Sequence, residues 1–268
     1  MSRSKPPEAA DTNAESLPHP PLPAPHDRDW AWFLDVDGTL LEIERHPDLV
    51  SADRELLELL DRLGDRYDGA VALISGRSLA QLERIFGPLS VAAAASHGLE
   101  LRPLADEVTL LADAVPDAVL QEIAEFTERH PGLVMERKSF SVGVHYRARP
   151  ELAREVAERL ENIVAGLNNG FRLQHGKMMV ELLPAAAGKG GAIRAFMQRR
   201  PFRGRRPIFV GDDLTDEHGF AAVNELGGLS VRVGDVPATS AQWRLGNVSE
   251  LRAWLLKAID RGEGRTSD

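Results

Sequence analysis

Two aspartates, Asp35 and Asp37, stand two residues apart, directly after the apolar residues 32–34 and before a Gly38-Thr39 turn. A short apolar run bounded by turn residues is typical of a buried strand. Carboxylates at the end of such a strand need a compensating charge, because an unpaired carboxylate is costly to remove from water. A hard cation such as Mg²⁺ supplies that charge and often shares its oxygen ligands with a substrate phosphate. The motif therefore predicts phosphoryl chemistry.

Three further polar clusters follow apolar runs or open a helix. They are Ser75-Gly76-Arg77, Lys189 in the glycine-rich stretch 188–191, and the acidic stretch 211–217 with Asp212, Asp213 and Asp216. Each cluster has an ordinary interpretation as a turn, a loop or a helix cap. In an open parallel sheet, however, ligands bind beyond the carboxyl ends of the strands. The order and positions of the clusters favour one shared site there.

The chemistry of a phosphate monoester assigns roles to these residues. An attacking carboxylate is repelled by ~1 kcal/mol per unit charge at about 4 Å in water, and by ~4 kcal/mol at an effective dielectric of 20. A divalent cation and a lysine reverse that sign. Asp35 is best placed as the nucleophile that forms an aspartyl-phosphate. Asp37 can protonate the leaving oxygen and then deprotonate the hydrolytic water.

The remaining polar residues are expected to hold the phosphate or the metal. The residues predicted to bind the phosphoryl group are Thr39, Ser75, Gly76 and Lys189. Mg²⁺ is expected to contact Asp35, Asp212 and the backbone carbonyl of Asp37. Asp213 and Asp216 are expected either as ligands through water or as residues that orient the ligands.

The elements that must position these residues alternate between strand-like and helical patterns, which indicates βαβ units and a mostly parallel sheet. The predicted strands of this core are 31–36, 70–74, 91–95, 207–210 and 229–233, and helices include 53–66, 79–86 and 188–199.

The middle of the chain has a different pattern. A helix over 116–130 precedes strands 133–138 and 141–147, and a helix over 150–168 precedes strands 171–175 and 178–183. Short turns inside each strand pair predict hairpins, and hence an antiparallel sheet with helices on one face. We therefore predict an α/β protein with a discontinuous core, 28–110 and 185–260, and an inserted α+β domain of order αββαββ over 111–184.

Composition excludes several classes of protein. The 268 residues carry a net charge of -9, which disfavours nucleic acid or an anionic membrane as partner, and they include no cysteine, so no thiolate metal site is possible. Neither a signal peptide nor a membrane span is expected. We expect a cytoplasmic monomer. Residues 1–27 have too few bulky apolar residues to offset their ordering entropy and are predicted to be a disordered tail, with a second flexible tail over 261–268.

The four polar clusters resemble those of the haloacid dehalogenase-like phosphatases, whose members form an aspartyl-phosphate and use Mg²⁺. This resemblance implies a Rossmann-like core, and it implies that the inserted domain is a cap over the active site. Further motifs, over about residues 28–256, are similar to those of the bacterial trehalose-6-phosphate phosphatases. These motifs are WAWFLDVDGTL (30–40), SHGLE (96–100), HYR (145–147), GKM (176–178) and GDDLTDE (211–217).

The resemblance to the trehalose-6-phosphate phosphatases implies hydrolysis of trehalose 6-phosphate, with a sugar held by the cap. Strand periodicity places Ser141, Gly143, His145 and Arg147 on one face. By itself this periodicity is equally compatible with a solvated face. The residues that the resemblance assigns to sugar binding are Glu136, Lys138, Arg147 and Glu181.

Three residues keep two interpretations each. His145 is expected either to contact the sugar or only to support its strand. Arg77 and His97 lie at the expected boundary of core and cap, where they could contact sugar or phosphate. His97 could equally be a structural histidine.

Two alternative functions remain open at this stage. The first is a phosphatase for another sugar phosphate, such as sucrose 6-phosphate, which differs only in what the cap recognises. The second is a non-catalytic sugar-phosphate sensor. The presence of Asp35, Asp37, Lys189 and Asp212 argues against a sensor, because a sensor does not need both acids.

Overall fold

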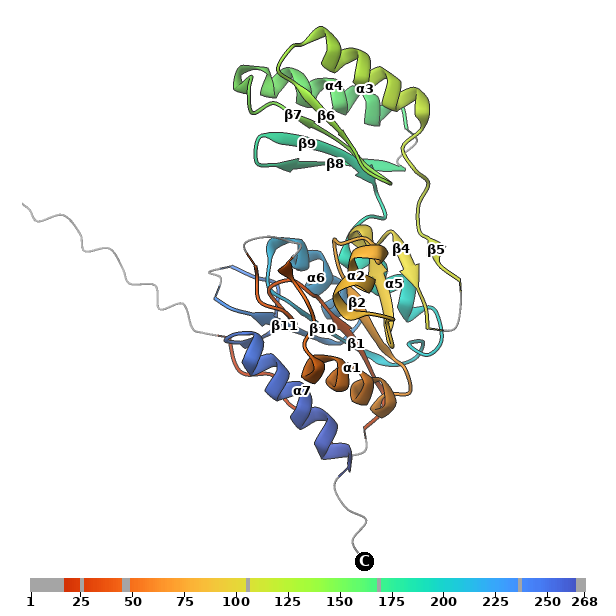
Figure 1. The fold of residues 1–268 in the computed structure, drawn as a ribbon, viewed down its shortest axis with the longest axis vertical. Helices are drawn as coiled ribbons and strands as arrows, with labels where there is room; N and C mark the ends of the chain where they lie inside the picture. Colours follow the sequence, from red (N-terminus) through yellow and green to blue (C-terminus); the bar gives the residue numbers. More distant parts are fainter. Residues whose placement is uncertain are drawn as a thin grey trace, which may run out of the picture.

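The computed structural model describes residues 17–24, 27–44, 49–104, 107–167, 170–235 and 238–263. These residues form two sheets, one of eight strands and one of four. Figure 1 shows the two sheets as separate bodies, with the smaller one and its helices lying beyond one edge of the larger. The predicted class, a mostly parallel α/β core with an α+β insertion, is confirmed.

The larger sheet has the strand order β12-β11-β10-β1-β2-β3-β4-β5. Its pairs from β12 to β3 are parallel, whereas β4 and β5 pair antiparallel at the edge. β1 lies in the middle because β10 returns to its other side. The strands are β1 (Trp30–Leu34), β2 (Val71–Ile74), β3 (Ala92–Ala95), β4 (Glu100–Arg102), β5 (Thr109–Leu110), β10 (Arg206–Gly211), β11 (Leu229–Val233) and β12 (Trp243–Leu245).

Helices cover both faces of this sheet, which is why its central strands are apolar throughout. Along β1, Trp32 and Leu34 pack with the helices of one face, and Ala31 and Phe33 pack with those of the other. Burial on both faces is typical of parallel strands. The first face carries α1 (Arg54–Arg66), α2 (Leu79–Phe86) and α7 (Val248–Glu263), and the second carries α5 (Lys189–Met197) and α6 (Glu217–Glu225).

The smaller sheet is antiparallel, with the order β6-β7-β9-β8. Val142 and Val144 of β7 pack against both of its helices, so one face of the sheet is covered. Figure 1 shows these helices on the side away from the larger sheet, which leaves the other face turned toward the core. The elements are α3 (Asp117–Arg129), β6 (Val134–Arg137), β7 (Val142–His145), α4 (Ala153–Ala165), β8 (Phe171–Gly176) and β9 (Met179–Pro184). The predicted order αββαββ is confirmed.

Part of the segment predicted to be a disordered N-terminal tail is packed on the core. Pro20 and Pro23 are buried, Leu22 packs against the core, and the backbone N–H of Arg244 in β12 donates to Pro18 O at 2.9 Å. A few apolar contacts suffice here because the edge strand also offers a backbone partner. Residues 1–16, 25 and 26 lie outside the described residues. At the other end, α7 continues to Glu263, beyond the predicted start of the flexible tail, and residues 264–268 are not among those described.

Three short strands were not predicted, namely β4, β5 and β12. Each has two or three residues, too few for an alternating pattern to stand out from a loop. No helix in the described part of the chain is long and apolar enough to cross a membrane.

Candidate active site

Lys189, Asp35 and Asp216 form the centre of the polar cluster at the carboxyl edge of the larger sheet. Lys189 Nζ lies 2.6 Å from Asp35 Oδ1 and 2.5 Å from Asp216 Oδ1. All three residues are buried, with at most 6% of any of them exposed. Lys189 opens α5, Asp35 directly follows β1, and Asp216 closes the short helix Leu214–Asp216 after β10. The order of the strands brings together residues 154 positions apart in the chain.

Asp212 and Thr39 extend this cluster. Thr39 Oγ1 lies 3.1 Å from Asp35 Oδ2 and 3.0 Å from Asp212 Oδ1, so the hydroxyl bridges acids from two neighbouring strands. One carboxylate oxygen from each of Asp35, Asp212 and Asp216 lies within 4.8 Å of the others. Oxygen ligands at such spacing suit a hard divalent cation. The sequence predicted Asp216 either as a ligand through water or as a residue that orients the ligands, and its carboxylate belongs to this group.

The charge balance of the cluster also fits a bound cation. Burial raises the pKa of Asp35 to about 7 despite its contact with Lys189, and burial together with the nearby Asp35 raises that of Asp216 to about 7. Burial raises the pKa of Asp212 as well. Lys189 behaves oppositely: burial would lower its pKa, but Asp35 and Asp216 raise it. One buried lysine therefore does not offset three acids, and a divalent cation would supply the missing positive charge.

Two glycines permit this close approach of acids. Gly38 has a φ of +79°, and a Cβ there would lie 2.2 Å from Asp212 Oδ2. A Cβ on Gly211 would lie 2.3 Å from Asp216 Cγ. Neither contact is possible for a real side chain, so both positions require glycine if the acids are to converge.

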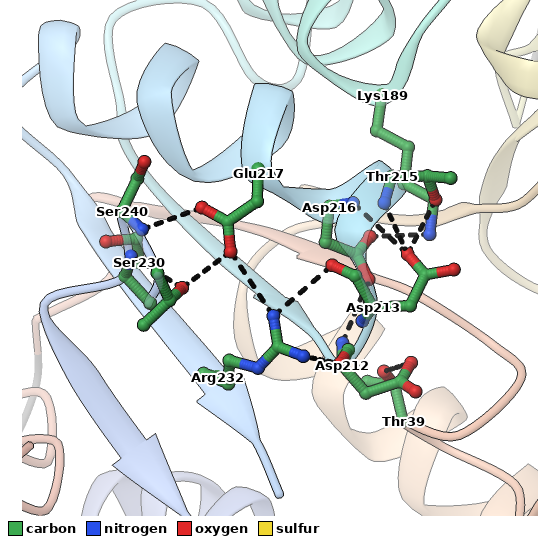
Figure 2. A network of polar contacts seen from close by, with 12 residues as sticks. Thr39, Lys189, Asp212, Asp213, Thr215, Asp216, Glu217, Ser230, Arg232 and Ser240 are labelled. Atoms are coloured by element: carbon green, nitrogen blue, oxygen red, sulfur yellow. Dashed lines mark hydrogen bonds and ion pairs between the residues drawn. The ribbon is translucent and has the colours of Figure 1, made fainter. Parts of the chain in front are cut away.

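The loop that carries Asp212 and Asp216 is ordered by its own side chains (Figure 2). Asp216 Oδ2 accepts the backbone N–H groups of Asp212 at 2.9 Å and Asp213 at 3.0 Å. Asp213 Oδ1 accepts from both the backbone N–H and the hydroxyl of Thr215, each at 2.7 Å. Burial alone would raise the pKa of Asp213, but these hydrogen bonds hold it below its ordinary value. Asp213 thus caps the following turn and does not enter the cluster of three acids.

Asp37 pairs with Arg77 and is not among the three acids of the cluster. Arg77 Nε donates to Asp37 Oδ2 at 2.7 Å, and its terminal nitrogen donates to Oδ1 at 2.6 Å. This forked geometry engages both carboxylate oxygens. The sequence predicted that Arg77 lies at the core–cap boundary, where it could contact sugar or phosphate, and in this structure its guanidinium binds Asp37.

Ser75 and Gly76 lie at the end of β2, close to the core–cap boundary. Ser75 is buried and its Oγ accepts the backbone N–H of Arg77 at 3.1 Å. A Cβ on Gly76 would lie 3.0 Å from His97 Cε1, so the glycine leaves room for that imidazole. His97 has a φ of +57°, in the left-handed region that few non-glycine residues adopt. Burial lowers its pKa, which favours a neutral imidazole.

The open face of the cap carries its own polar cluster around Glu181. Lys138 Nζ lies 2.9 Å from Glu181 Oε1, and Ser141 Oγ donates to the same oxygen at 2.6 Å. Burial would raise the pKa of Glu181, but Ser141 and Lys138 lower it below its ordinary value. A second pair, His145 Nε2 and Glu136 Oε2, lies 2.7 Å apart on the same face. A buried carboxylate, a lysine and an imidazole can each make directional hydrogen bonds to hydroxyl groups.

Two hollows, of about 380 and 430 Å³, lie between core and cap. His97, Glu181 and Leu183 line both of them, so the hollows flank the place where core and cap approach each other. Lys189 lines the first hollow, and Glu136 and Lys138 line the second. Other polar lining residues are Arg172, Gln174, His175, Thr215 and His218 in the first and Ser78, Gln81, Ser96, Ser139 and Ser141 in the second.

Arg147 is the one predicted cap residue that the structure separates from the others. β7 ends at His145, and Arg147 is exposed in the turn that follows, so the prediction that it continues the face of the strand was wrong. It lines neither of the two hollows described above. The strand ends early because the chain turns at Arg147 and Ala148 to enter α4.

Gln174 of β8 was missed. It belongs to one row across the four strands. Gln174 pairs with Glu181, Glu181 pairs with Gly143, and Gly143 pairs with Glu136. Cross-strand neighbours share a face, so Gln174 belongs to the same row as the two glutamates. The alternation of apolar Phe171 and Leu173 with polar Arg172 and Gln174 was the available signal.

Comparison with known proteins agrees with this geometry. A family model described as trehalose-phosphatase matches residues 33–249. Trehalose-6-phosphate phosphatase of Escherichia coli (strain K12) is 42% identical over 233 residues, covering 84% of this chain and 85% of the relative. Among solved structures, trehalose-6-phosphate phosphatase of Aspergillus fumigatus matches with a TM-score of 0.73 and 29% identity, covering 87% of this chain and 93% of that one.

A more distant structure indicates the fold alone. A Bacteroides thetaiotaomicron protein described among phosphatases of the haloalkanoate (HAD) superfamily matches with a TM-score of 0.59 and 18% identity, covering 87% of this chain and 95% of that one. The fold is therefore HAD-like.

Proposed function

The chain belongs to the trehalose-phosphatase family, and we propose that it hydrolyses trehalose 6-phosphate to trehalose and phosphate with Asp35 as nucleophile and Mg²⁺ as cofactor. The observation that carries this proposal is the convergence of Asp35, Asp212 and Asp216 on one point beside Lys189. The cluster lies under the polar face of a cap, which suits a substrate with a phosphate at one end and hydroxyl groups at the other.

The metal would be held by Asp35 and Asp212, with Asp216 as a further acid of the same group and the backbone carbonyl of Asp37 completing the set. When bound, Mg²⁺ would supply the positive charge that lets a carboxylate approach an anionic phosphate. Lys189 adds a second positive charge beside Asp35. Thr39, Ser75 and Gly76 remain the proposed contacts of the phosphoryl oxygens.

The first chemical step is attack of an Asp35 carboxylate oxygen on phosphorus. The bond from phosphorus to the sugar oxygen breaks, and Asp37 gives its proton to that leaving oxygen. In the second step Asp37 takes a proton from water, and the resulting hydroxide displaces Asp35 and releases phosphate. Both oxygens of Asp37 accept from Arg77, and each oxygen keeps a second lone pair that can carry the proton.

The cap would select the sugar. We propose that Glu136, Lys138 and Glu181 contact hydroxyl groups of the disaccharide, since their side chains gather on the face that turns to the core. Arg147 and His97 remain candidates, Arg147 only if cap movement brings its turn closer. Movement of the cap toward the core would exclude water from the phosphoryl group until the free sugar leaves.

Phosphate release from a panel of sugar phosphates tests the assignment. We expect trehalose 6-phosphate to be hydrolysed far faster than sucrose 6-phosphate or glucose 6-phosphate. Comparable rates on all three would rule out the trehalose assignment and leave a general sugar phosphatase. Turnover should stop when a chelator removes divalent metal and return with added Mg²⁺; turnover that survives the chelator would contradict the proposed cofactor.

A further inference from the structure

Arg232 of β11 is a buried cation next to the acidic loop and outside the cluster of three acids. Only 3% of the residue is exposed. In the parallel ladder it lies beside Gly211, the last residue of β10 before the acidic loop. Figure 2 shows its guanidinium pointing at that loop. One terminal nitrogen donates to the backbone carbonyl of Asp212, and the other donates to that of Asp213 at 3.3 Å.

We propose that Arg232 is a positioning residue for the metal site, which holds Asp212 in the orientation that a divalent cation requires. This inference rests on the proposed function insofar as Asp212 is taken as a metal ligand.

Both the N–H and the C=O groups of the loop backbone are hydrogen-bonded. Asp216 accepts the N–H groups of Asp212 and Asp213 on one side, and Arg232 donates to the carbonyl groups of the same two residues on the other. With the N–H and the C=O of Asp212 both engaged, the backbone of this residue cannot rotate without breaking a hydrogen bond. Its side chain then leaves the backbone in a fixed direction, toward Thr39 and Asp35.

The positive charge of Arg232 is balanced locally by Glu217. Glu217 Oε1 lies 3.2 Å from the guanidinium and also accepts the hydroxyl of Thr239 at 2.7 Å, while Oε2 accepts the backbone N–H of Ser240 at 2.7 Å. Because the pair is neutral together, Arg232 does not oppose a cation by charge. Its contribution to the metal site is geometric, and arginine suits it because the planar fork reaches two carbonyls and a carboxylate together.

The chain offers a matched control on the neighbouring strand. Arg244 of β12 lies directly opposite Arg232 in the parallel ladder, and it pairs with Asp235 at 2.6 Å. Arg244→Met therefore removes the same type of side chain from the same sheet without touching the carbonyls of the acidic loop.

The test measures Mg²⁺ binding by calorimetry to the metal-free full-length protein without substrate, together with thermal unfolding in a chelator. Residues that orient metal ligands typically cost about 10- to 100-fold in metal affinity when replaced, and we expect a loss in that range for Arg232→Met. Arg232→Lys keeps the charge but cannot make all three contacts, so we expect a smaller loss. Arg244→Met should bind Mg²⁺ like the parent.

An Arg232→Met protein that unfolds at a lower temperature but binds Mg²⁺ with the parent affinity would overturn the inference, because a purely structural residue behaves in that way. If Arg232→Met does not fold, Arg232→Lys decides, and parent affinity in that variant would have the same consequence. Phosphate release from trehalose 6-phosphate by the parent protein is measured separately. A parent that binds Mg²⁺ but does not use this substrate would contradict the proposed function and leave the role of Arg232 intact.

Discussion

The buried acids of the core and of the cap have pKa values that are shifted in opposite directions. In the core, Asp35 and Asp216 share Lys189, Asp212 lies beside them, and burial raises the pKa of all three acids. In the cap, Glu181 pairs with Lys138 and accepts a hydrogen bond from a hydroxyl, and these contacts lower its pKa. The core cluster is therefore short of positive charge, whereas the cap cluster is balanced within the protein.

This difference indicates what each region is built to receive. A site with uncompensated buried acids gains most from a cation, and a cation in turn favours an anionic phosphate. A site whose acid is already paired can offer hydrogen bonds without demanding a charge, which suits a neutral sugar. We propose that the two regions divide the substrate between them, and substitutions in each should then have separable effects.

The largest effect is expected from the core nucleophile. Asp35→Asn keeps the size of the side chain but removes the attacking carboxylate, so turnover should fall by about 10⁴-fold or more, as for nucleophiles in other hydrolases. Phosphate release measures the loss on trehalose 6-phosphate and on p-nitrophenyl phosphate. The loss should be equally severe on both esters, and undiminished activity on either would refute the assignment of Asp35.

Removal of the cap acid should act on the sugar alone. Glu181→Gln keeps the shape of the side chain but loses its charge, and a hydrogen bond to a charged group is worth ~1.5–3 kcal/mol, or about 10- to 100-fold in kcat/KM. We expect that loss with trehalose 6-phosphate and little change with p-nitrophenyl phosphate. Glu136→Ala should behave in the same way.

Glu122→Gln is the matched control for the cap acid, because Glu122 pairs with Arg159 at 2.8 Å on the helices of the cap. Its kinetics should equal those of the parent with both esters. Equal losses on the two esters in Glu181→Gln would show that this residue does not contact the sugar.

A smaller effect is expected from Gln174, which shares the row of Glu181 and Glu136. Gln174→Ala removes a neutral hydrogen-bonding group, worth ~0.5–1.5 kcal/mol or about 2- to 10-fold in kcat/KM for the disaccharide. Gln121→Ala serves as control, because Gln121 is exposed on α3 and bonds Glu125 at 3.1 Å. If the two variants match, the sugar does not extend over β8.

A separate prediction concerns stability and not activity: the pH dependence of unfolding should differ in sign between the two regions. In the metal-free protein the pKa of Asp216 is raised from 3.8 to about 7. Between these two pH values the folded state binds more protons than the unfolded state, so the protein loses stability as pH rises. Asp216→Asn should remove this loss of stability, which amounts to ~1.4 kcal/mol of unfolding free energy for each unit of pKa shift. Urea unfolding across this pH range measures it.

The pKa of Glu181 is lowered from 4.5. The stability that ionised Glu181 adds to the folded state is therefore present above this pH value and is lost as the pH falls below it. Ser141→Ala, which removes one cause of the lowered pKa, should reduce this acid sensitivity. For each variant we compare the change in unfolding free energy, relative to the parent, across the pH range. If this change rises with pH in both Asp216→Asn and Ser141→Ala, or falls in both, the contrast between core and cap is contradicted.

Local patterns in the sequence were sufficient for much of the fold. The apolar run before Asp35 predicted β1, and the period of the middle segment predicted the helices and hairpins of the cap, because apolar spacing depends on near neighbours along the chain. The strands β4, β5 and β12 were missed because two or three residues carry no period. The packing of residues 17–24 was missed because it depends on a partner strand more than 200 residues away.

The candidate site divides in the same way. The sequence by itself determined which residue types stand at the ends of which strands, and therefore that Asp35, Lys189 and Asp212 could do phosphoryl chemistry. Only the tertiary structure decided that Asp216 joins Asp35 and Lys189, that Arg77 binds Asp37, and that Arg232 holds the acidic loop. The physical reason is that these contacts are set by strand order and register, which place residues side by side that are far apart along the chain.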